Sequence, residues 1–285
     1  MEQKEKIEKI EKIEDIILRH SRRSMDILRH YMPEDYCLEA AKDILSWEKG
    51  TIFLTTGFYV AGHAETDGPA GTVVLAEAVK KLGYHPVIVT DHFCKGFFEI
   101  RGLAVEYMPL EEEMGEGFCK QILKKHHPVG LISIERCGRN VKEDYTNMRG
   151  ISIKEHTAAI DMLFEMTDGL IPSIGVGDGG NEIGMGNMAN IIAEKLLLIP
   201  SKTRVDRLVI ACVSNWGAYA ITAYLEKLTK IKLLPDFEEI RSYIEETVKI
   251  GSVDGVTHEP NVTVDGYDIA VEKEIVESLH EAVSA

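Results

Sequence analysis

The chain has 285 residues, of which 45% are hydrophobic and 28% charged, a balance typical of a globular protein with a sizeable core. Its 47 acidic and 32 basic residues give a net charge of −15, which disfavours nucleic acid or an anionic membrane as a partner. No apolar run reaches the roughly 18 residues of a membrane span, and the acidic start is unlike a secretory signal or transit peptide. We therefore expect a cytoplasmic protein that binds neither nucleic acid nor membrane.

Residues 1–48 are predicted to form a helical extension ahead of the main domain. The segment 5–20, EKIEKIEKIEDIILRH, is helical by composition and carries a stripe of Ile7, Ile10, Ile13 and Ile17. A repeat of three drifts around a helix of 3.6 residues per turn. The segment is therefore expected to be a solvated helix that packs along one short edge. The alternative is a dimer-forming helix, which would make the protein a homo-oligomer.

Residues 49–285 are predicted to form one α/β domain. Short apolar runs alternate with helical stretches, which indicates a doubly wound, mainly parallel sheet with helices on both faces. The expected strands are 51–58, 86–90, 105–110, 129–134, 170–176 and 207–214. The expected helices are 70–82, 112–125, 154–166, 187–198, 217–230 and 236–250, with a closing helix from 269. Two VDG segments, 253–255 and 264–266, are expected to pair with each other as a small hairpin.

Open α/β sheets bind ligands at the carboxyl ends of their strands, so the residues that follow each strand are the candidates for a site. After the first strand, Glu65 and Asp67 are two residues apart and could coordinate a cation. The glycines of the next helix start could receive a phosphate or carboxylate on free N–H groups. The alternative is that Asp67 only caps the helix. The candidates for substrate binding here are Thr56, Gly57, Gly68, Gly71 and Thr72.

The fourth strand is followed by SIERCGRN and then by YTNMRG. At a strand end, Glu135 could act as a base, while Arg136 or Arg139 could hold a carboxylate. A structural ion pair is the alternative. Asn140, Asn147 and Arg149 are further candidates for substrate binding.

The fifth strand is followed by GDGGNEIGMG, in which Asp178, Asn181 and Glu182 are surrounded by glycines. Oxygen ligands in a flexible loop suit Mg²⁺, Mn²⁺ or Ca²⁺. A dinucleotide fingerprint fits poorly, because it belongs at the first strand–helix turn. A purely structural loop is the other alternative. After the sixth strand, Asn215 in SNWGAYA could cap a helix or contact substrate, and Trp216 is expected in the core.

In this order, the motifs ETDGPAG, SIERCGRN, YTNMRG, GDGGNEIGMGN, SNWGAYA and VDGVT…VTVDG resemble the D-glutamate cyclase-like C-terminal domain family, from about residue 51 to 270. The resemblance implies an α/β fold and conversion of D-glutamate to 5-oxo-D-proline and water. Many stand-alone prokaryotic members are domains of unknown function, so the fold transfers more safely than the substrate. The chain departs from the family pattern at Cys137, where proline is frequent, but keeps the preceding charged pair.

We therefore expect a metal-dependent enzyme, a lyase or cyclase, that acts on a small anionic substrate. Glu135, Asp67 and Arg136 are the expected catalytic residues, with Glu135 transferring the proton. The expected ligands for a Mn, Mg or Ca ion are Glu65, Asp67, Asp178, Asn181 and Glu182. The same residue types would also serve a metal-dependent phosphohydrolase. A binding module without catalysis is the third hypothesis.

Overall fold

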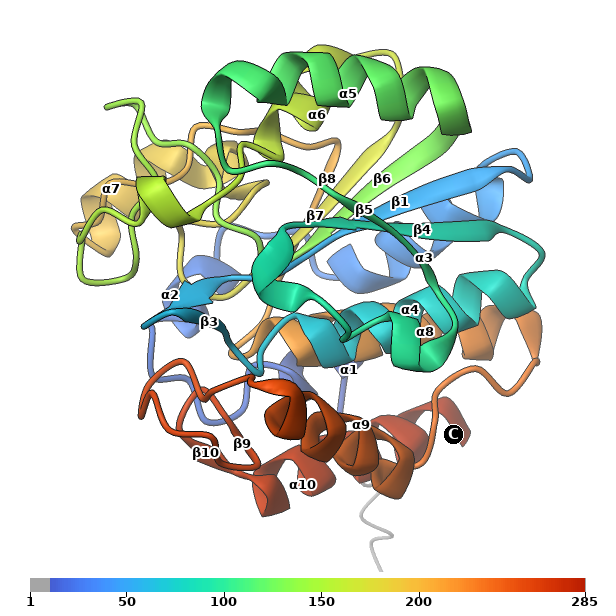
Figure 1. Cartoon of the computed structure of the whole chain (residues 1–285). Helices are drawn as coiled ribbons and strands as arrows, with labels where there is room; N and C mark the ends of the chain where they lie inside the picture. Colours follow the sequence, from blue (N-terminus) through green and yellow to red (C-terminus); the bar gives the residue numbers. More distant parts are fainter. Residues whose placement is uncertain (1–10, 285) are drawn as a thin grey trace, which may run out of the picture.

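The computed structural model describes residues 11–284, which form a parallel six-stranded sheet with helices on both faces (Figure 1). The strands lie in the order β5-β4-β1-β6-β7-β8, and every neighbouring pair is parallel. The predicted doubly wound α/β fold is confirmed. The strands are β1 (Thr51–Thr55), β4 (His85–Thr90), β5 (Ala104–Tyr107), β6 (Pro128–Ile134), β7 (Ser173–Gly177) and β8 (Arg207–Ile210).

The sheet is covered on both faces, which explains its continuous apolar strands. Ile52, Phe53 and Leu54 are consecutive in β1, so they point to opposite faces, yet all three are fully buried. One face is covered by α3 (Tyr36–Ser46), α4 (Pro69–Lys81) and α8 (Ser214–Thr229), with α9 (Phe237–Ile250) and α10 (Ile269–Ser284) packed outside them. The other face carries α5 (Glu112–His126) and α6 (Asp161–Thr167) (Figure 1). The helix α7 (Ala189–Lys195) and four short 3-10 turns, His92–Cys94, Glu99–Arg101, Lys154–His156 and Met185–Met188, lie in the connections.

The strand order places a topological switch between β1 and β6. From β1 the chain runs outward to β4 and β5, then returns to the other side of β1 as β6. Connections leave these two strands in opposite directions, which opens a crevice at their carboxyl ends. The residues that follow β1 and β6 therefore meet at the place where doubly wound sheets bind ligands.

Several predicted boundaries differ from the structure. The first strand ends at Thr55, three residues before its predicted end, and a hairpin of β2 (Tyr59–Val60) and β3 (His63–Ala64) follows. The helix expected over 154–166 begins only at Asp161, after a 3-10 turn. The last strand ends at Ile210, and α8 begins at Ser214, three residues before its predicted start. Because these strands are shorter than predicted, the polar residues that follow them lie in loops at the carboxyl edge of the sheet.

The predicted pairing of the two VDG segments is wrong. β9 (Thr263–Val264) pairs with β10 (Tyr267–Asp268), so the second segment is itself the turn of a hairpin. Asp265 and Gly266 both have positive φ, +53° and +69°, as a tight Asp-Gly turn requires. The first segment is attached to this turn by Asp254, whose Oδ2 accepts a hydrogen bond from the Gly266 N–H at 2.8 Å.

The N-terminal segment packs closely against the domain. α1 (Ile13–Ile16) and α2 (Met25–Arg29) precede α3, which covers the sheet beside β8. Ile13 and Ile17 are buried, whereas Ile7 and Ile10 lie outside the described residues. Within the described part, the predicted helix over 5–20 ends at residue 16. The division into an extension over 1–48 and a domain over 49–285 stays a prediction. Between residues 11 and 284, no helix is both long and apolar enough to cross a bilayer.

Candidate active site

Three buried carboxylates meet at the carboxyl edge of the sheet. Glu135 directly follows β6, Asp178 directly follows β7, and Asp67 precedes α4 after the β2–β3 hairpin. One oxygen atom of each lies within 4.8 Å of the others. The predicted convergence of Asp67 and Asp178 with Glu135 is therefore confirmed, and it follows from the parallel strand order.

Asp67 and Asn215 hold the starts of two helices. The Asp67 carboxylate accepts hydrogen bonds from the Ser214 and Asn215 N–H groups of α8, both at 2.8 Å. The Asn215 Oδ1 atom accepts from the Gly71 N–H of α4 at 2.6 Å and from the Gly68 N–H at 3.0 Å. Asp67, which precedes α4, thus binds free N–H groups at the start of α8, and Asn215 of α8 binds those at the start of α4. The N–H groups expected to receive a substrate anion bind Asn215 instead.

The close crossing of α4 and α8 explains the glycines of this loop. A Cβ atom at Gly71 would lie 2.8 Å from the Asn215 Cα, and Gly68 has a φ of +94° that other residues rarely adopt. Thr56 and Thr72 are buried beside this crossing, and neither hydroxyl has a hydrogen-bond partner within the described residues. These two buried threonines therefore pack against the helix crossing next to the site.

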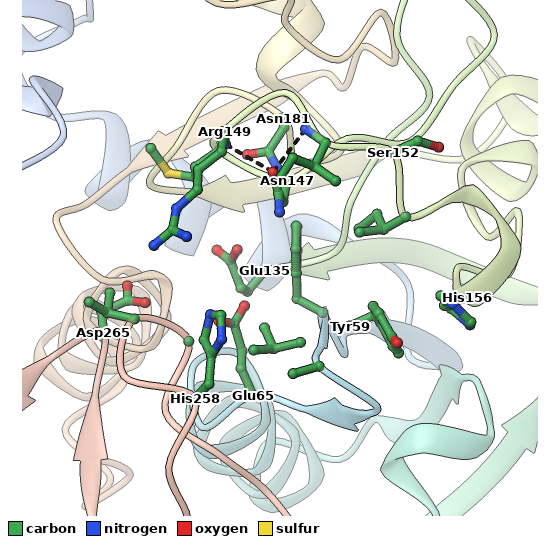
Figure 2. Close-up of a pocket in the computed structure, with 18 of the residues that line it drawn as sticks. Tyr59, Glu65, Glu135, Asn147, Arg149, Ser152, His156, Asn181, His258 and Asp265 are labelled. Atoms are coloured by element: carbon green, nitrogen blue, oxygen red, sulfur yellow. Dashed lines mark hydrogen bonds between the residues drawn. The ribbon is translucent and has the colours of Figure 1, made fainter.

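Glu135 is held in an unusual backbone conformation. Its φ is +47°, in the left-handed region that residues other than glycine rarely adopt. The Ser214 hydroxyl donates a hydrogen bond to its Oε2 at 2.5 Å. Figure 2 shows Glu135 and Glu65 among the residues that line a cavity. A side chain at Gly255 would collide with Glu65, because its Cβ would lie 1.9 Å from the Oε2.

Arg23 bridges two carboxylates that come from distant parts of the chain. Its guanidinium lies 2.5 Å from the Asp178 Oδ1 and 2.5 Å from the Asp265 Oδ1. The second oxygen of each carboxylate is buried without a hydrogen-bond partner in the described part of the chain. Sequence reasoning missed both Arg23 and Asp265. The Asp-Gly turn signal could have located the hairpin that carries Asp265, but no local pattern brings Arg23 to the sheet edge.

The electrostatics of this cluster favour protons or a cation. Burial, reinforced by neighbouring carboxylates, raises the pKa of Glu65 and Glu135 well above the usual range. Burial raises the pKa of Asp178 in the same way, although Arg23 opposes the shift. The pKa of Asp67 rises to about 8, because burial outweighs its hydrogen bonds from Asn215 and Ser214. The cluster holds more negative charge than Arg23 balances.

The glycine-rich loop places its polar residues differently. The Glu182 carboxylate accepts hydrogen bonds from the Gly179 N–H at 2.8 Å and the Gly180 N–H at 2.7 Å, so it closes its own loop. The Asn181 amide donates to the Thr146 carbonyl at 2.8 Å and lines the cavity. Of the predicted metal ligands, Asp67 and Asp178 therefore belong to the three-carboxylate cluster.

A cavity of about 420 Å³ opens above the cluster. Five of the predicted site residues line it: Glu65, Glu135, Asn147, Arg149 and Asn181. It is also lined by residues that sequence reasoning did not select, including Arg23. Four others, Tyr59, His156, His258 and Asp265, are labelled in Figure 2. The polar loop after β6, the β2–β3 hairpin and the segment before β9 thus supply its walls.

Arg136 lies outside the lining of this cavity. Its guanidinium forms an ion pair with the Asp91 carboxylate at 2.6 Å and donates to the carbonyls of Gly57 at 2.6 Å and Ala158 at 2.8 Å. The side chain is fully buried, so these contacts join three loops at the sheet edge. They correspond to the structural ion pair that was the alternative interpretation of this motif.

Arg139 and Asn140 are also absent from the lining of the cavity. The Arg139 guanidinium contacts the Tyr145 hydroxyl at 3.2 Å and the Glu112 carboxylate at 2.8 Å. The Asn140 Oδ1 accepts a hydrogen bond from the Lys142 N–H at 2.8 Å and closes a turn. Both residues stabilise the loop that carries Asn147 and Arg149 to the cavity.

Comparison with known families identifies the chain's relatives. The sequence model of the family described as D-glutamate cyclase-like, C-terminal, matches residues 13–280. The chain belongs to this family. The mitochondrial D-glutamate cyclase of Homo sapiens is 31% identical over 223 residues, which cover 69% of this chain and 35% of the human protein. The chain thus spans about a third of the length of that relative in the D-glutamate cyclase-like family.

Solved structures give weaker similarities. An actinorhodin polyketide ketoreductase with NADPH is 10% identical, with a TM-score of 0.32 over 82% of this chain and 90% of that chain. TubZ of Clostridium botulinum phage c-st is 10% identical, with a TM-score of 0.23 over 63% of this chain and 47% of that chain. Similarities at this level carry no information on the function of this D-glutamate cyclase-like protein.

Proposed function

We propose that the protein is an enzyme that cyclises D-glutamate to 5-oxo-D-proline and water. Membership of the D-glutamate cyclase-like family and the name of the human relative support this reaction. The observation that carries the proposal is Glu135, a buried carboxylate with a raised pKa that lines the cavity together with Glu65. A buried carboxylate with a raised pKa that lines a cavity is a candidate for proton exchange with a substrate.

The reaction requires two proton transfers on one substrate. The substrate nitrogen bonds to the γ-carboxylate carbon, a C–O bond breaks, and the departing oxygen leaves as water with two of the three protons of the former ammonium. Glu135 takes a proton from the ammonium so that the amine can attack, then returns it toward the departing oxygen. Its raised pKa lets it serve as base and then as acid, as catalytic carboxylates in apolar sites do.

The cavity offers separate places for the charged groups of the substrate. The ammonium would lie at the acidic floor between Glu65, Glu135 and Asp265, which line the same cavity. Arg149 is exposed at the rim and forms no ion pair within the described residues, so it would attract a substrate carboxylate. This arrangement would turn the nitrogen toward Glu135.

A divalent cation fits the three-carboxylate cluster. Asp67 and Asp178 would hold it through oxygen atoms, the ligands that Mg²⁺, Mn²⁺ and Ca²⁺ prefer, and Glu135 would lie beside the ion and stay free to exchange protons. The buried, unpartnered Oδ2 of Asp178 is the atom that lacks a partner for such an ion to supply. Bound there, the ion would offset negative charge and supply Lewis-acid polarisation of a substrate carboxylate.

The reaction is tested by NMR of D-glutamate incubated with protein that has been stripped with chelator, with and without added Mn²⁺ or Mg²⁺. We expect 5-oxoproline from D-glutamate and much less from L-glutamate. A phosphate ester assayed in parallel should release no phosphate. Phosphate release without 5-oxoproline would overturn the cyclase proposal in favour of a phosphohydrolase.

Binding of the cation is tested by thermal unfolding with Mn²⁺. At a concentration of 100 times Kd, a bound ion stabilises the folded state by about 2.7 kcal/mol. Asp178→Asn should abolish this stabilisation. The matched control is Asp168→Asn, an exposed carboxylate at the end of α6, which should keep it. An equal response of both variants would show that the cluster is not the binding site.

A further inference from the structure

Arg23 is the cationic residue that the N-terminal segment brings to the cavity. It lies between α1 and α2, and it lines the cavity together with Glu65, Glu135 and Asp265. The cyclisation proposed above gives Arg23 no contact with the substrate. A guanidinium that lines a cavity is nevertheless the group best suited to binding a carboxylate, because its planar fork of N–H groups matches the two oxygen atoms.

The Arg23 guanidinium has donors beyond those that its two partners use. Its Nη1 donates to the Asp178 Oδ1 and its Nη2 lies beside the Asp265 Oδ1, both at 2.5 Å. A guanidinium carries five N–H donors, so others remain. The Arg23 side chain is 18% exposed, whereas that of Arg136, which binds Asp91 and two carbonyls, is 1% exposed. A ligand in the cavity can therefore reach Arg23 without breaking its ion pairs.

The backbone around Arg23 is fixed on both sides. The Arg22 guanidinium lies over the Tyr267 ring, 3.9 Å from its centroid, and the Tyr267 hydroxyl donates a hydrogen bond to the His20 carbonyl. His20 and Ser24 have φ angles of +62° and +61°, in the left-handed region that residues other than glycine rarely adopt. Such conformations persist where the surrounding contacts impose them, and they are frequent at functional sites. These contacts hold Arg23 at the cavity.

The charges of the substrate indicate which of its groups meets this guanidinium. Ring closure joins the substrate nitrogen to the γ-carbon, so the γ-carboxylate has to lie next to the ammonium, which the proposed reaction places beside Glu65, Glu135 and Asp265. A carboxylate among other carboxylates is repelled unless a cation accompanies it. Arg23 pairs with Asp265 and lines the same cavity, so it can be that cation. Arg149 at the rim is left for the α-carboxylate.

We propose that Arg23 binds the γ-carboxylate of the substrate and so selects an acidic side chain over its amide. The inference rests on the proposed cyclisation of D-glutamate and adds a substrate-binding residue to it. The same contact assists the reaction. When the nitrogen bonds to the γ-carbon, the electron pair of the C=O bond moves onto its oxygen, so that both γ-oxygen atoms carry negative charge. A guanidinium that is already in place stabilises this charge.

The test measures binding of D-glutamate and of D-glutamine by calorimetry at saturating Mn²⁺. All variants carry Glu135→Gln, which slows turnover during the measurement. Asp265→Asn is the reference, and Arg23→Gln is added to it, so that the guanidinium is removed while the net charge of the pair stays zero. We expect this removal to weaken binding of D-glutamate by about 10–100-fold and that of D-glutamine by about threefold at most.

The outcomes for Arg23 and for the proposed function are distinguishable. Equal weakening of the two ligands would show that Arg23 only supports the structure, and it would overturn the inference. Absence of D-glutamate binding in the reference would overturn it as well. The cyclisation itself is judged separately, by 5-oxoproline formation with the wild-type protein. Selective loss of D-glutamate binding without any product from the wild type would keep the carboxylate site and overturn the proposed function.

Two further variants separate the guanidinium from the segment that carries it. Arg23→Lys keeps the charge and favours folding, but it loses the planar fork, so D-glutamate should bind about five- to tenfold more weakly. Arg22→Ala is the matched control, because Arg22 is the exposed neighbour and lies outside the cavity lining. It should change the affinities for both ligands by the same factor. A selective loss of D-glutamate binding in Arg22→Ala would overturn the inference, since the loss would then come from the segment.

Discussion

Two sets of buried carboxylates lie at the same edge of the sheet and differ in their partners. Asp91 and Asp161 are paired: Asp91 with the Arg136 guanidinium, and Asp161 with the Tyr145 hydroxyl and the Arg139 N–H. Asp178 and Asp265 share Arg23, and each keeps one buried oxygen without a partner. Fully paired carboxylates stabilise the fold, whereas incompletely paired ones next to a cavity are available to a ligand.

The largest expected effect concerns Glu135, which belongs with Asp178 and Asp265 to the carboxylates next to the cavity. Glu135→Gln keeps the size of the side chain and the contact to Ser214 but removes the proton-transferring group. We expect turnover of D-glutamate to fall by about 10²–10⁴-fold, measured by NMR of 5-oxoproline. The melting temperature should stay the same or rise, because a buried carboxylate among like charges is removed. An active Glu135→Gln variant would place the acid–base residue elsewhere.

The paired set is tested by Arg136→Met. The substitution leaves Asp91 buried without its cation, which typically costs about 3–5 kcal/mol in the free energy of unfolding. Urea denaturation measures this loss, and Asp91→Asn added to the same variant should recover part of it. An Arg136→Met variant with an unchanged free energy of unfolding but weaker substrate binding would contradict the distinction between the two sets.

From the sequence, the carboxylates next to the cavity could be located, but they could not be distinguished from the paired carboxylates. Asp67, Glu135 and Asp178 could be predicted, because each lies just after a strand or before a helix and parallel strands end at one edge. Glu135 and Arg136 are adjacent in sequence, yet they face different surroundings. The turn at Glu135, with its positive φ, decides which side chain reaches the cavity, and no residue pattern specifies that turn.

Other parts of the site depend on contacts between distant segments. The strand and helix order followed from apolar periodicity, but Arg23 reaches Asp178 only because the segment between α1 and α2 packs against the sheet edge. A helix start was correctly predicted at Gly68 and Gly71. Its N–H groups were expected to bind an anion, but they donate to the Asn215 side chain of another helix. Local patterns could not show that this partner exists.

A carboxylate with neutral partners gives an intermediate case. Glu272 of α10 accepts hydrogen bonds from the Trp216 indole at 2.6 Å and the Tyr219 hydroxyl at 2.9 Å. Burial raises its pKa from 4.5 to about 7, because no cation offsets the desolvation. Between these two pH values, the folded state keeps a proton that the unfolded state releases. Its contribution to stability is therefore lost as the pH rises through this interval.

Glu272→Gln should remove this pH dependence. The difference in the free energy of unfolding between wild type and variant should change by up to about 3 kcal/mol from pH 4.5 to 7.5, at about 1.4 kcal/mol per pH unit. Urea unfolding at several pH values measures it. Parallel curves for the two proteins would show that Glu272 holds its charge in the folded state, and that neutral donors suffice to pair a buried carboxylate.

The smallest expected effect separates two arginines of the loop after β6. Arg149 is exposed at the cavity rim, whereas Arg139 contacts Tyr145 and Glu112 outside the cavity. Arg149→Ala should raise KM for D-glutamate about fivefold with little change in kcat, as expected for loss of an exposed charge contact of about 1 kcal/mol. Arg139→Ala should instead lower the urea midpoint, because it removes a partner of a half-buried network. If Arg139→Ala raised KM and Arg149→Ala did not, the loop would present its other side to the substrate, and the paired network would belong to the binding site.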